Sequence, residues 1–245
     1  MTANLISTSE NVWPPHYSLR RSTRAKYMRI RITPHTGLEV VVPHMPRKPE
    51  IIHNLLLEHK NWIEKMLQKY NMQHGRPAIL PPVEQLHFPT FNQTWRINYL
   101  KLAGEKIFIR QTGPFQLTCL GAIENVPLKL QALRIWLNRQ GKQLLLPLLQ
   151  QISDLFQLPF SAGQIRYQKT RWGSCSAKKL ISLNQKLLFL PENLVRYIII
   201  HELCHTVHLN HSRRFWQLVA KFDPDVDQHR REMKNADQWI PAELI

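Results

Sequence analysis

The residues that constrain the fold of this chain most are His201 and His205, four positions apart, with Glu202 between them. On an α-helix, side chains four positions apart lie on one face, one turn from each other. A helix over this segment would let both imidazoles bind one metal ion from a single rigid element. Glu202, one step around the helix, would face a water on that metal. The segment therefore predicts a helix beside an open metal site.

Two imidazoles and a neighbouring carboxylate are the ligands and the base that zinc-dependent hydrolases use. Bound zinc lowers the pKa of its water to about 7, so Glu202 can take a proton at neutral pH. A structural zinc site would need four protein ligands, and Cys175 and Cys204 are the candidates to complete it. Cys204 is rotated about 60° from His201 around the helix, which favours a place in the core. A chance occurrence on a core helix is the third interpretation, and the pattern favours metal-assisted hydrolysis.

The third protein ligand comes from His208 or His211. His208 lies about 20° from His201 around the helix axis but about 10 Å along it, which is far for metal–nitrogen bonds near 2 Å. His211 lies beyond the helix end that we predict near Asn210, where a turn could bring its ring back to the metal. We therefore expect His201, His205 and His211 as ligands and water in the fourth position, with His208 as the alternative.

Charge and composition indicate a basic, folded protein. Lys and Arg number 33 against 17 Asp and Glu, which gives a formal net charge of +16. This charge favours an anionic partner such as nucleic acid or a nucleotide phosphate, or else a solvated basic surface. Three cysteines without a CxxC pair favour a reducing compartment. Residues 1–15 lack a secretory pattern, and no apolar stretch reaches eighteen residues, so we expect a cytoplasmic protein without a membrane span.

Strand patterns dominate the first half of the chain and helix patterns the second, which predicts an α+β fold. In the first half we expect strands within 17–43 and over 86–91, 94–100, 106–110 and 115–119, and a helix over 47–71. In the second half we expect strands over 164–170 and 180–184, and helices over 127–151, from 190–193 to Asn210, over 212–219 and near 225–235. Pro147 is expected to kink or end the first of these helices.

Four segments give the chain a family resemblance: KTRWGSCS at 169–176, ISLNQKLLFLP at 181–191, YIIIHELCHTVHLNHSRRFW at 197–216, and the following Asp-Pro at 223–224. With these motifs the chain resembles the YgjP-like metallopeptidase family of predicted metal-dependent hydrolases. The resemblance implies a zincin-like α+β fold over 121–245, preceded by a β-rich basic region over 1–120. It also places a third histidine in the NHS..FW stretch, which matches His211. The separation of the first and third ligands is similar to that in SprT-like and Wss-type proteases, which act on DNA-bound proteins.

A zincin fold implies a strand beside the metal helix that holds an extended substrate, and the segment from Lys169 to Ser176 is the candidate. Within it, Arg171 could hold a carboxylate or phosphate, stabilise an oxyanion, or form an ordinary surface ion pair. Trp172 fits a pocket wall or the core, and Ser174 is a further substrate-binding candidate. Asn184 is expected to bind substrate, to hydrogen-bond a ligand histidine, or to form a turn.

The first half carries a basic cluster within twelve residues. Strand geometry would place Arg29 and Arg31 on one face, as a stripe that could follow phosphates without reading sequence. A solvated strand face is the alternative. The cluster consists of Arg20, Arg21, Arg24, Lys26, Arg29 and Arg31.

The sequence leaves three functions open. The first is a zinc metallopeptidase, with one divalent cation and Glu202 as general base. The second is a metal-dependent phosphohydrolase of the nucleoside triphosphate pyrophosphatase type, which would hold phosphate with side chains because no GxxxxGK[ST] loop is present. The third is a nucleic-acid-binding module with a structural metal. The expected substrate is accordingly a peptide, a protein or a nucleotide.

Overall fold

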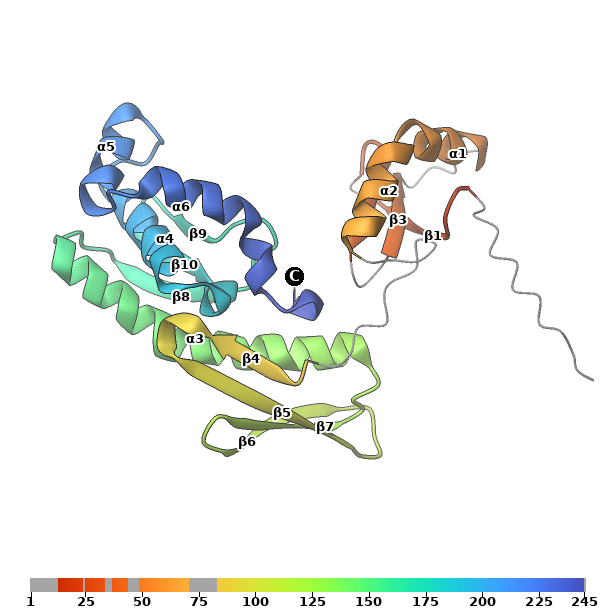
Figure 1. The fold of residues 1–245 in the computed structure, drawn as a ribbon, viewed down its shortest axis with the longest axis horizontal. Helices are drawn as coiled ribbons and strands as arrows, with labels where there is room; N and C mark the ends of the chain where they lie inside the picture. Colours follow the sequence, from red (N-terminus) through yellow and green to blue (C-terminus); the bar gives the residue numbers. More distant parts are fainter. Residues whose placement is uncertain (1–12, 24, 34–36, 44–48, 71–82, 245) are drawn as a thin grey trace, which may run out of the picture. The chain divides into compact units, whose positions relative to one another are not determined.

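The computed structural model describes residues 13–23, 25–33, 37–43, 49–70 and 83–244 (Figure 1). The fold is α+β, as the sequence predicts, and the chain forms two compact units, Met1–Pro81 and Pro82–Ile245. This division differs from the expected boundary at residue 120. The strands between the two positions belong to the second unit because Leu86, Trp95 and Leu117 lie in one core cluster with the following long helix. Arg24 and residues 1–12 lie outside the described residues.

The first unit is a three-stranded sheet with two helices. Strand β3 (Gly37–Pro43) lies between β1 (Tyr17–Ser22), which is parallel to it, and β2 (Arg29–Thr33), which is antiparallel. Alternation in β2 directs Ile30 and Ile32 towards a core that includes residues of α1 (Pro49–Glu58) and α2 (Lys60–Lys69).

Arg20 of β1 meets the basic residues of β2 on the other face of this sheet. Arg31 lies opposite Glu39 in the register, and Arg29 lies two positions along the same strand. Arg20 Nε donates to Glu39 Oε2 at 3.0 Å, and Arg31 Nη1 lies 3.9 Å from the same oxygen. The predicted shared face of Arg29 and Arg31 is thus confirmed, and an internal carboxylate neutralises part of its charge.

The single helix expected over 47–71 is two helices within the described residues. The break falls at His59, whose backbone leaves the helical region. Its Nδ1 donates to the carbonyl of Leu55 at 3.1 Å, and its amide hydrogen bonds to Leu56, three residues back. The His59 side chain therefore occupies the Leu55 carbonyl, which would accept from the His59 amide if the helix continued.

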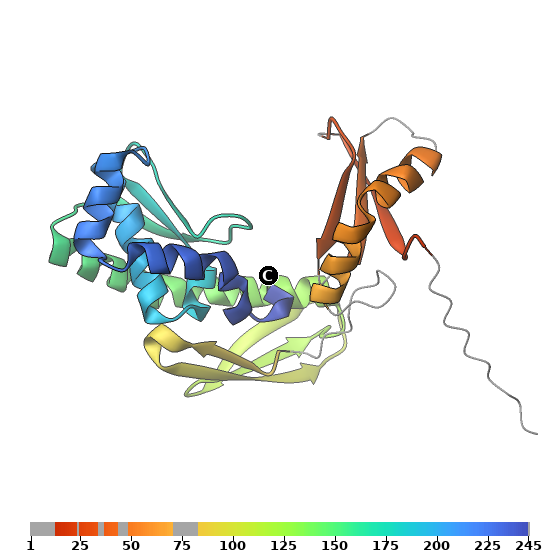
Figure 2. The same ribbon diagram turned by 45° about the horizontal axis from the view of Figure 1, so that its top comes forward.

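The second unit begins with a four-stranded sheet in the order β4-β5-β7-β6. Its strands are β4 (Gln85–Phe88), β5 (Gln93–Lys101), β6 (Ile107–Gly113) and β7 (Gln116–Gly121). The sheet packs against α3 (Val126–Phe156), which lies between it and the remaining elements of the unit (Figures 1 and 2).

Helix α3 corrects one expectation. Pro147 was expected to kink or end a helix over 127–151, yet the helix runs for 31 residues and ends at Phe156. Proline removes one backbone hydrogen bond from a helix interior. Burial of Leu145, Leu149 and Ile152 on both sides of the proline offsets this loss, because all three side chains lie in the main core.

The remaining elements surround the predicted metal helix. A second sheet has the order β8-β10-β9, so that β9 is an edge strand. The sheet contains β8 (Ala162–Arg166), β9 (Gly173–Cys175) and β10 (Leu180–Asn184), and it is followed by η2 (Gln185–Phe189), α4 (Glu192–Cys204), α5 (Arg213–Phe222), α6 (Val226–Glu232), η3 (Met233–Trp239) and η4 (Ala242–Leu244). The strand expected over 169–176 is therefore only three residues long. Within the described residues, no helix combines the length and apolar character that crossing a membrane requires.

Helix α4 begins after Pro191 and buries most of its surface, as an apolar helix inside a core does. It ends at Cys204, earlier than the predicted end near Asn210. The amides of Thr206 and Val207 bond to carbonyls three residues back, and Thr206 Oγ1 donates to the Leu203 carbonyl at 2.8 Å. These bonds tighten the last turn and end the helix. The chain after Cys204 then turns back towards the C-terminal end of α4.

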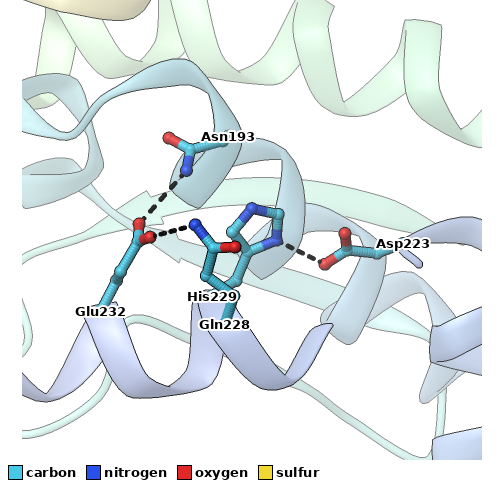
Figure 3. Close-up of polar contacts among 5 residues, drawn as sticks. All are labelled: Asn193, Asp223, Gln228, His229 and Glu232. Carbon is cyan, nitrogen blue, oxygen red and sulfur yellow. Dashed lines mark hydrogen bonds and ion pairs between the residues drawn. The ribbon is translucent and has the colours of Figure 1, made fainter. Parts of the chain in front are cut away.

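Polar contacts fix α6 against both neighbouring helices (Figure 3). His229 Nδ1 donates to Asp223 Oδ2 at the end of α5, at 2.8 Å, and both side chains are buried. Glu232 accepts from Asn193 in the first turn of α4 at 3.3 Å and from Gln228 at 2.8 Å. The first turn of α4 is thus hydrogen-bonded to α6.

Candidate metal centre

Three histidines converge at the end of α4. His201 lies in its last turn, His205 at its C-cap, and His211 just before α5. Each offers one ring nitrogen, and these atoms lie within 4.8 Å of one another. The Nε2 atoms of His201 and His211 are 3.1 Å apart. The early end of α4 allows this approach, because the turn after Cys204 returns the chain to the helix.

The donor set fits a zinc ion. Two nitrogens that each lie about 2.0–2.1 Å from a tetrahedral zinc ion are about 3.4 Å apart. The observed 3.1 Å between His201 Nε2 and His211 Nε2 is close to that separation. His201 Nδ1 is buried and has no hydrogen-bond partner among the described residues, so hydrogen bonding to the protein does not explain why this ring is buried here. Three nitrogens leave the fourth tetrahedral position open, as catalytic zinc sites require.

The surroundings favour the neutral form of His201 and His205. Burial, together with the charges of His205, His211 and Arg230, lowers the pKa of His201 to about 3. Burial also lowers the pKa of His205. Phe215 stacks on the His205 ring at 4.4 Å between centroids, which provides part of the apolar environment. A neutral imidazole has a free lone pair, which metal binding requires.

His208 contributes to this site through its backbone. Its carbonyl accepts a hydrogen bond from His205 Nδ1 at 3.0 Å. A carbonyl has no proton to give, so Nδ1 carries the hydrogen and Nε2 is left as the lone-pair nitrogen. The His208 ring is not in the histidine cluster. The spacing of histidines in the sequence concerns only the rings and gives no signal for this backbone contact.

Glu202 is buried beside this cluster, with 6% of its surface exposed. Gly173 in β9 lies against it: a Cβ at position 173 would be 2.7 Å from both Cγ and Oε1 of Glu202. Within the described residues Glu202 forms no ion pair. Burial raises its pKa to about 8, and the charge of Arg171 opposes this shift. The carboxylate is therefore free to exchange a proton near neutral pH.

The two cysteines considered as structural ligands are absent from the cluster. Cys204 is fully buried in the main core, as its helical position predicts. Burial raises its pKa to about 12, and burial with the charge of Glu202 raises the pKa of Cys175 to about 11. Neither side chain contributes a ligand atom to the cluster, which does not support a closed structural site of four protein ligands.

The four candidate substrate residues lie in and after the 169–176 segment. Arg171 is exposed and forms no ion pair with a described residue, so the ordinary ion-pair interpretation is not supported. Trp172 packs against the main core, and Ser174 pairs with Ser182 across the sheet. Arg171, Trp172 and Asn184 line one cavity, and Ser174 is not among its lining residues.

Asn184 shapes the segment that precedes β9. Its Nδ2 donates to the carbonyls of Gln168 at 2.8 Å and Arg171 at 2.7 Å. Its Oδ1 accepts from the amide of Lys186, and its own amide donates to the carbonyl of Trp172. Both polar atoms of its side chain thus bond to backbone, which supports the turn-forming interpretation over a hydrogen bond to a ligand histidine.

Comparisons with known proteins identify the family of this chain. A family model described as the YgjP-like metallopeptidase domain matches residues 26–236. The crystal structure of the metallopeptidase zymogen of Pyrococcus abyssi abylysin matches with 28% sequence identity over 38% of this chain and 93% of that chain, at a TM-score of 0.35. A comparison with curated proteins gave no match. Because the family model spans most of the chain and all three converging histidines, the chain belongs to the YgjP-like metallopeptidase family.

Proposed function

We propose that this chain is a zinc-dependent metallopeptidase, with His201, His205 and His211 as the metal ligands and Glu202 as the general base. The observation that carries the proposal is the buried carboxylate of Glu202, unpaired within the described residues and one helical position from a ligand histidine. A structural metal site has no use for such a group, whereas hydrolysis requires it. Membership of a metallopeptidase family supports a divalent metal and a peptide substrate.

Each residue has a distinct task in this proposal. A bound zinc ion supplies Lewis acidity, which polarises the substrate carbonyl and acidifies water. The three imidazoles hold the ion, and the His208 carbonyl holds His205 in the required tautomer. Glu202 takes the proton of the attacking water and passes it to the leaving amine. Gly173 leaves the space that the Glu202 side chain occupies.

The edge strand β9 is the proposed place for the substrate backbone. It pairs with β10 on one side and with no other strand in the described part of the chain. An extended peptide can add to such an edge by main-chain hydrogen bonds. Because Gly173 in this strand touches Glu202, a peptide on the same edge lies close to the base.

The test compares substrates on the zinc-loaded protein, with Glu202→Gln as the control variant. We expect peptide cleavage by the wild type, at least a 100-fold lower rate in the variant, and one zinc per chain in both. Equal turnover by the two proteins would contradict the base assignment. Nucleoside triphosphates form the second arm, because the phosphohydrolase expected as the alternative would use the same metal. Hydrolysis of triphosphates without peptide cleavage would replace the peptidase proposal.

A further inference from the structure

A cationic cavity of about 210 Å³ lies between the segment before β9, the start of η2, and η3. Four of its lining residues are basic, Lys169, Arg171, Lys186 and Lys234, and one is acidic, Asp237. We call this cavity the lysine pocket. None of the four basic residues forms an ion pair with a described residue. The lining therefore keeps an excess of positive charge, of which Asp237 offsets only part.

Lys186 is a largely buried basic residue of the lysine pocket. Only 6% of its surface is exposed, and its ammonium makes no hydrogen bond with a described residue. Its nearest described aromatic contact is the Tyr167 ring, whose centroid lies 5.6 Å from Nζ. Burial lowers the pKa of Lys186, as do the charges of Arg134 and Lys169, whereas Asp237 raises it. Lys186 lines the cavity, and its ammonium has no hydrogen-bond or ion-pair partner among the described residues, so a bound anion would supply one.

Hydrogen bonds from a buried side chain hold the residues that line the lysine pocket in place. Asn184, itself 2% exposed, holds the carbonyls of Gln168 and Arg171 with its side-chain amide. Its Oδ1 also accepts from the amide of Lys186, another residue that lines the pocket. One buried side chain thus fixes both the segment that carries Arg171 and the start of η2. Such pre-organisation is typical of a binding site.

The lysine pocket is close to the candidate metal centre. Arg171 and Trp172 line it, and Gly173, the next residue, contacts Glu202. Two residues of chain span at most about 7 Å, which is also about two residues of an extended peptide. The charge of Arg171 reaches Glu202, where it lowers the pKa. A group bound in the pocket and a bond cleaved at the metal centre can therefore belong to one substrate.

We propose that the lysine pocket is a specificity site that binds a carboxylate of the peptide substrate, from an acidic side chain or from the chain's C-terminus. The inference rests on the proposed peptidase function and names its substrate class. The volume favours a small group, since pockets for ligands of drug size usually measure about 300–1,000 Å³. Lysine and arginine side chains recognise carboxylates by charge-assisted hydrogen bonds.

Matched peptides test the proposal. One series carries Glu or Gln at successive positions on either side of the cleaved bond, and another ends in a free carboxylate or an amide. We expect the wild type to prefer Glu at one position, or the free carboxylate, by about 10- to 100-fold in kcat/KM. Lys186→Met and Lys234→Met should each bring that ratio towards one, mainly by raising KM for the acidic peptide. Lys234 is exposed, so its variant serves if Lys186→Met does not fold.

Lys142→Met is the control, because Lys142 is exposed on α3 and does not line the lysine pocket. It should keep the wild-type preference.

Peptide cleavage without any carboxylate preference would overturn the pocket assignment and leave the peptidase proposal standing. If no peptide is cleaved, binding of N-acetylglutamate against N-acetylglutamine separates the two proposals. If the wild type binds N-acetylglutamate and the variants Lys186→Met and Lys234→Met do not, the result would support carboxylate binding in the pocket without supporting the peptidase proposal. Tighter binding of inorganic tripolyphosphate than of N-acetylglutamate would overturn the carboxylate assignment in favour of phosphate.

Discussion

The Cα atom of Gly173 lies against the side chain of Glu202, so closely that a Cβ at this position would be 2.7 Å from both Cγ and Oε1. The two residues come from different elements, the edge strand β9 and the helix α4. Their contact fixes the distance between the proposed base and the backbone that is proposed to hold the substrate.

Gly173→Ala should displace the Glu202 carboxylate. We expect kcat/KM to fall by about 100-fold, because a displacement of about 1 Å in a catalytic group has an effect of that size. Zinc content, measured by atomic emission, should be unchanged. Gly163→Ala is the matched control: its Cβ would be 3.0 Å from the flexible end of Leu146, far from any proposed ligand. That variant should lose some stability and keep its activity. Wild-type activity in Gly173→Ala would show that this contact does not position the base.

His211→Ala should weaken zinc binding by at least about 100-fold, since even residues that only support a ligand contribute 10- to 100-fold. His208→Ala should bind zinc nearly as well as the wild type, because the substitution keeps the carbonyl that accepts from His205. Competition with a chromophoric chelator measures both affinities. Equal zinc affinity in the two variants would contradict the assignment of His211.

Removal of zinc by a chelator should abolish activity and leave most of the structure intact. The core of the second unit is formed by apolar side chains from both sheets, α3, α4 and α5, and the histidine cluster lies at the end of one helix. Far-UV circular dichroism should therefore change little, while the melting temperature falls because a ligand of the folded state is lost. Unfolding by the chelator alone would favour the structural-metal alternative.

Asn184→Ala should lower the free energy of unfolding by about 1–3 kcal/mol, because it leaves buried backbone groups without partners. Asn193→Ala is the control, since Asn193 is exposed and makes a single side-chain hydrogen bond, to Glu232. Urea denaturation measures both. If the two variants were equally stable, the Asn184 amide would not be what holds the segment before β9.

The buried pair of Glu243 and Lys129 predicts a pH dependence of stability. Burial raises the pKa of Glu243 more than the charge of Lys129, 3.7 Å away, lowers it. The folded state therefore binds this proton more tightly than the unfolded state does. This contribution is fully present below the unfolded pKa of about 4.5 and is lost as pH rises through the folded pKa. Melting curves from pH 4.5 to 8 should show a loss in the wild type that Glu243→Gln lacks, and parallel curves would contradict it.

Helix starts and metal-ligand spacing could be predicted from the sequence because both depend on neighbouring residues. Pro191 precedes α4 and Ser212 caps α5, as local rules for helix starts suggest. The spacing of His201 and His205 likewise depends only on helix geometry. The resemblance and a turn argument identified His211, and the structure brings its ring to the other two.

Other features depend on packing between distant segments. Pro147 continues a helix because of the core around it, and α4 ends early because Thr206 bonds back to Leu203. Neither effect is visible in a local pattern. The approach of Gly173 to Glu202 depends on how β9 packs against α4. A glycine inside a strand does signal a close approach, and that signal in RWGSC was available.

The brevity of β9 has a consequence for selectivity. A three-residue edge offers a bound chain very few main-chain hydrogen bonds, so backbone pairing alone gives little affinity. Selectivity between peptide sequences then depends on contacts of the substrate with protein groups outside β9. If the proposed peptidase function holds, a compact folded protein should resist cleavage, since a segment must be extended before it can lie along this edge, whereas tails and linkers should be cleaved.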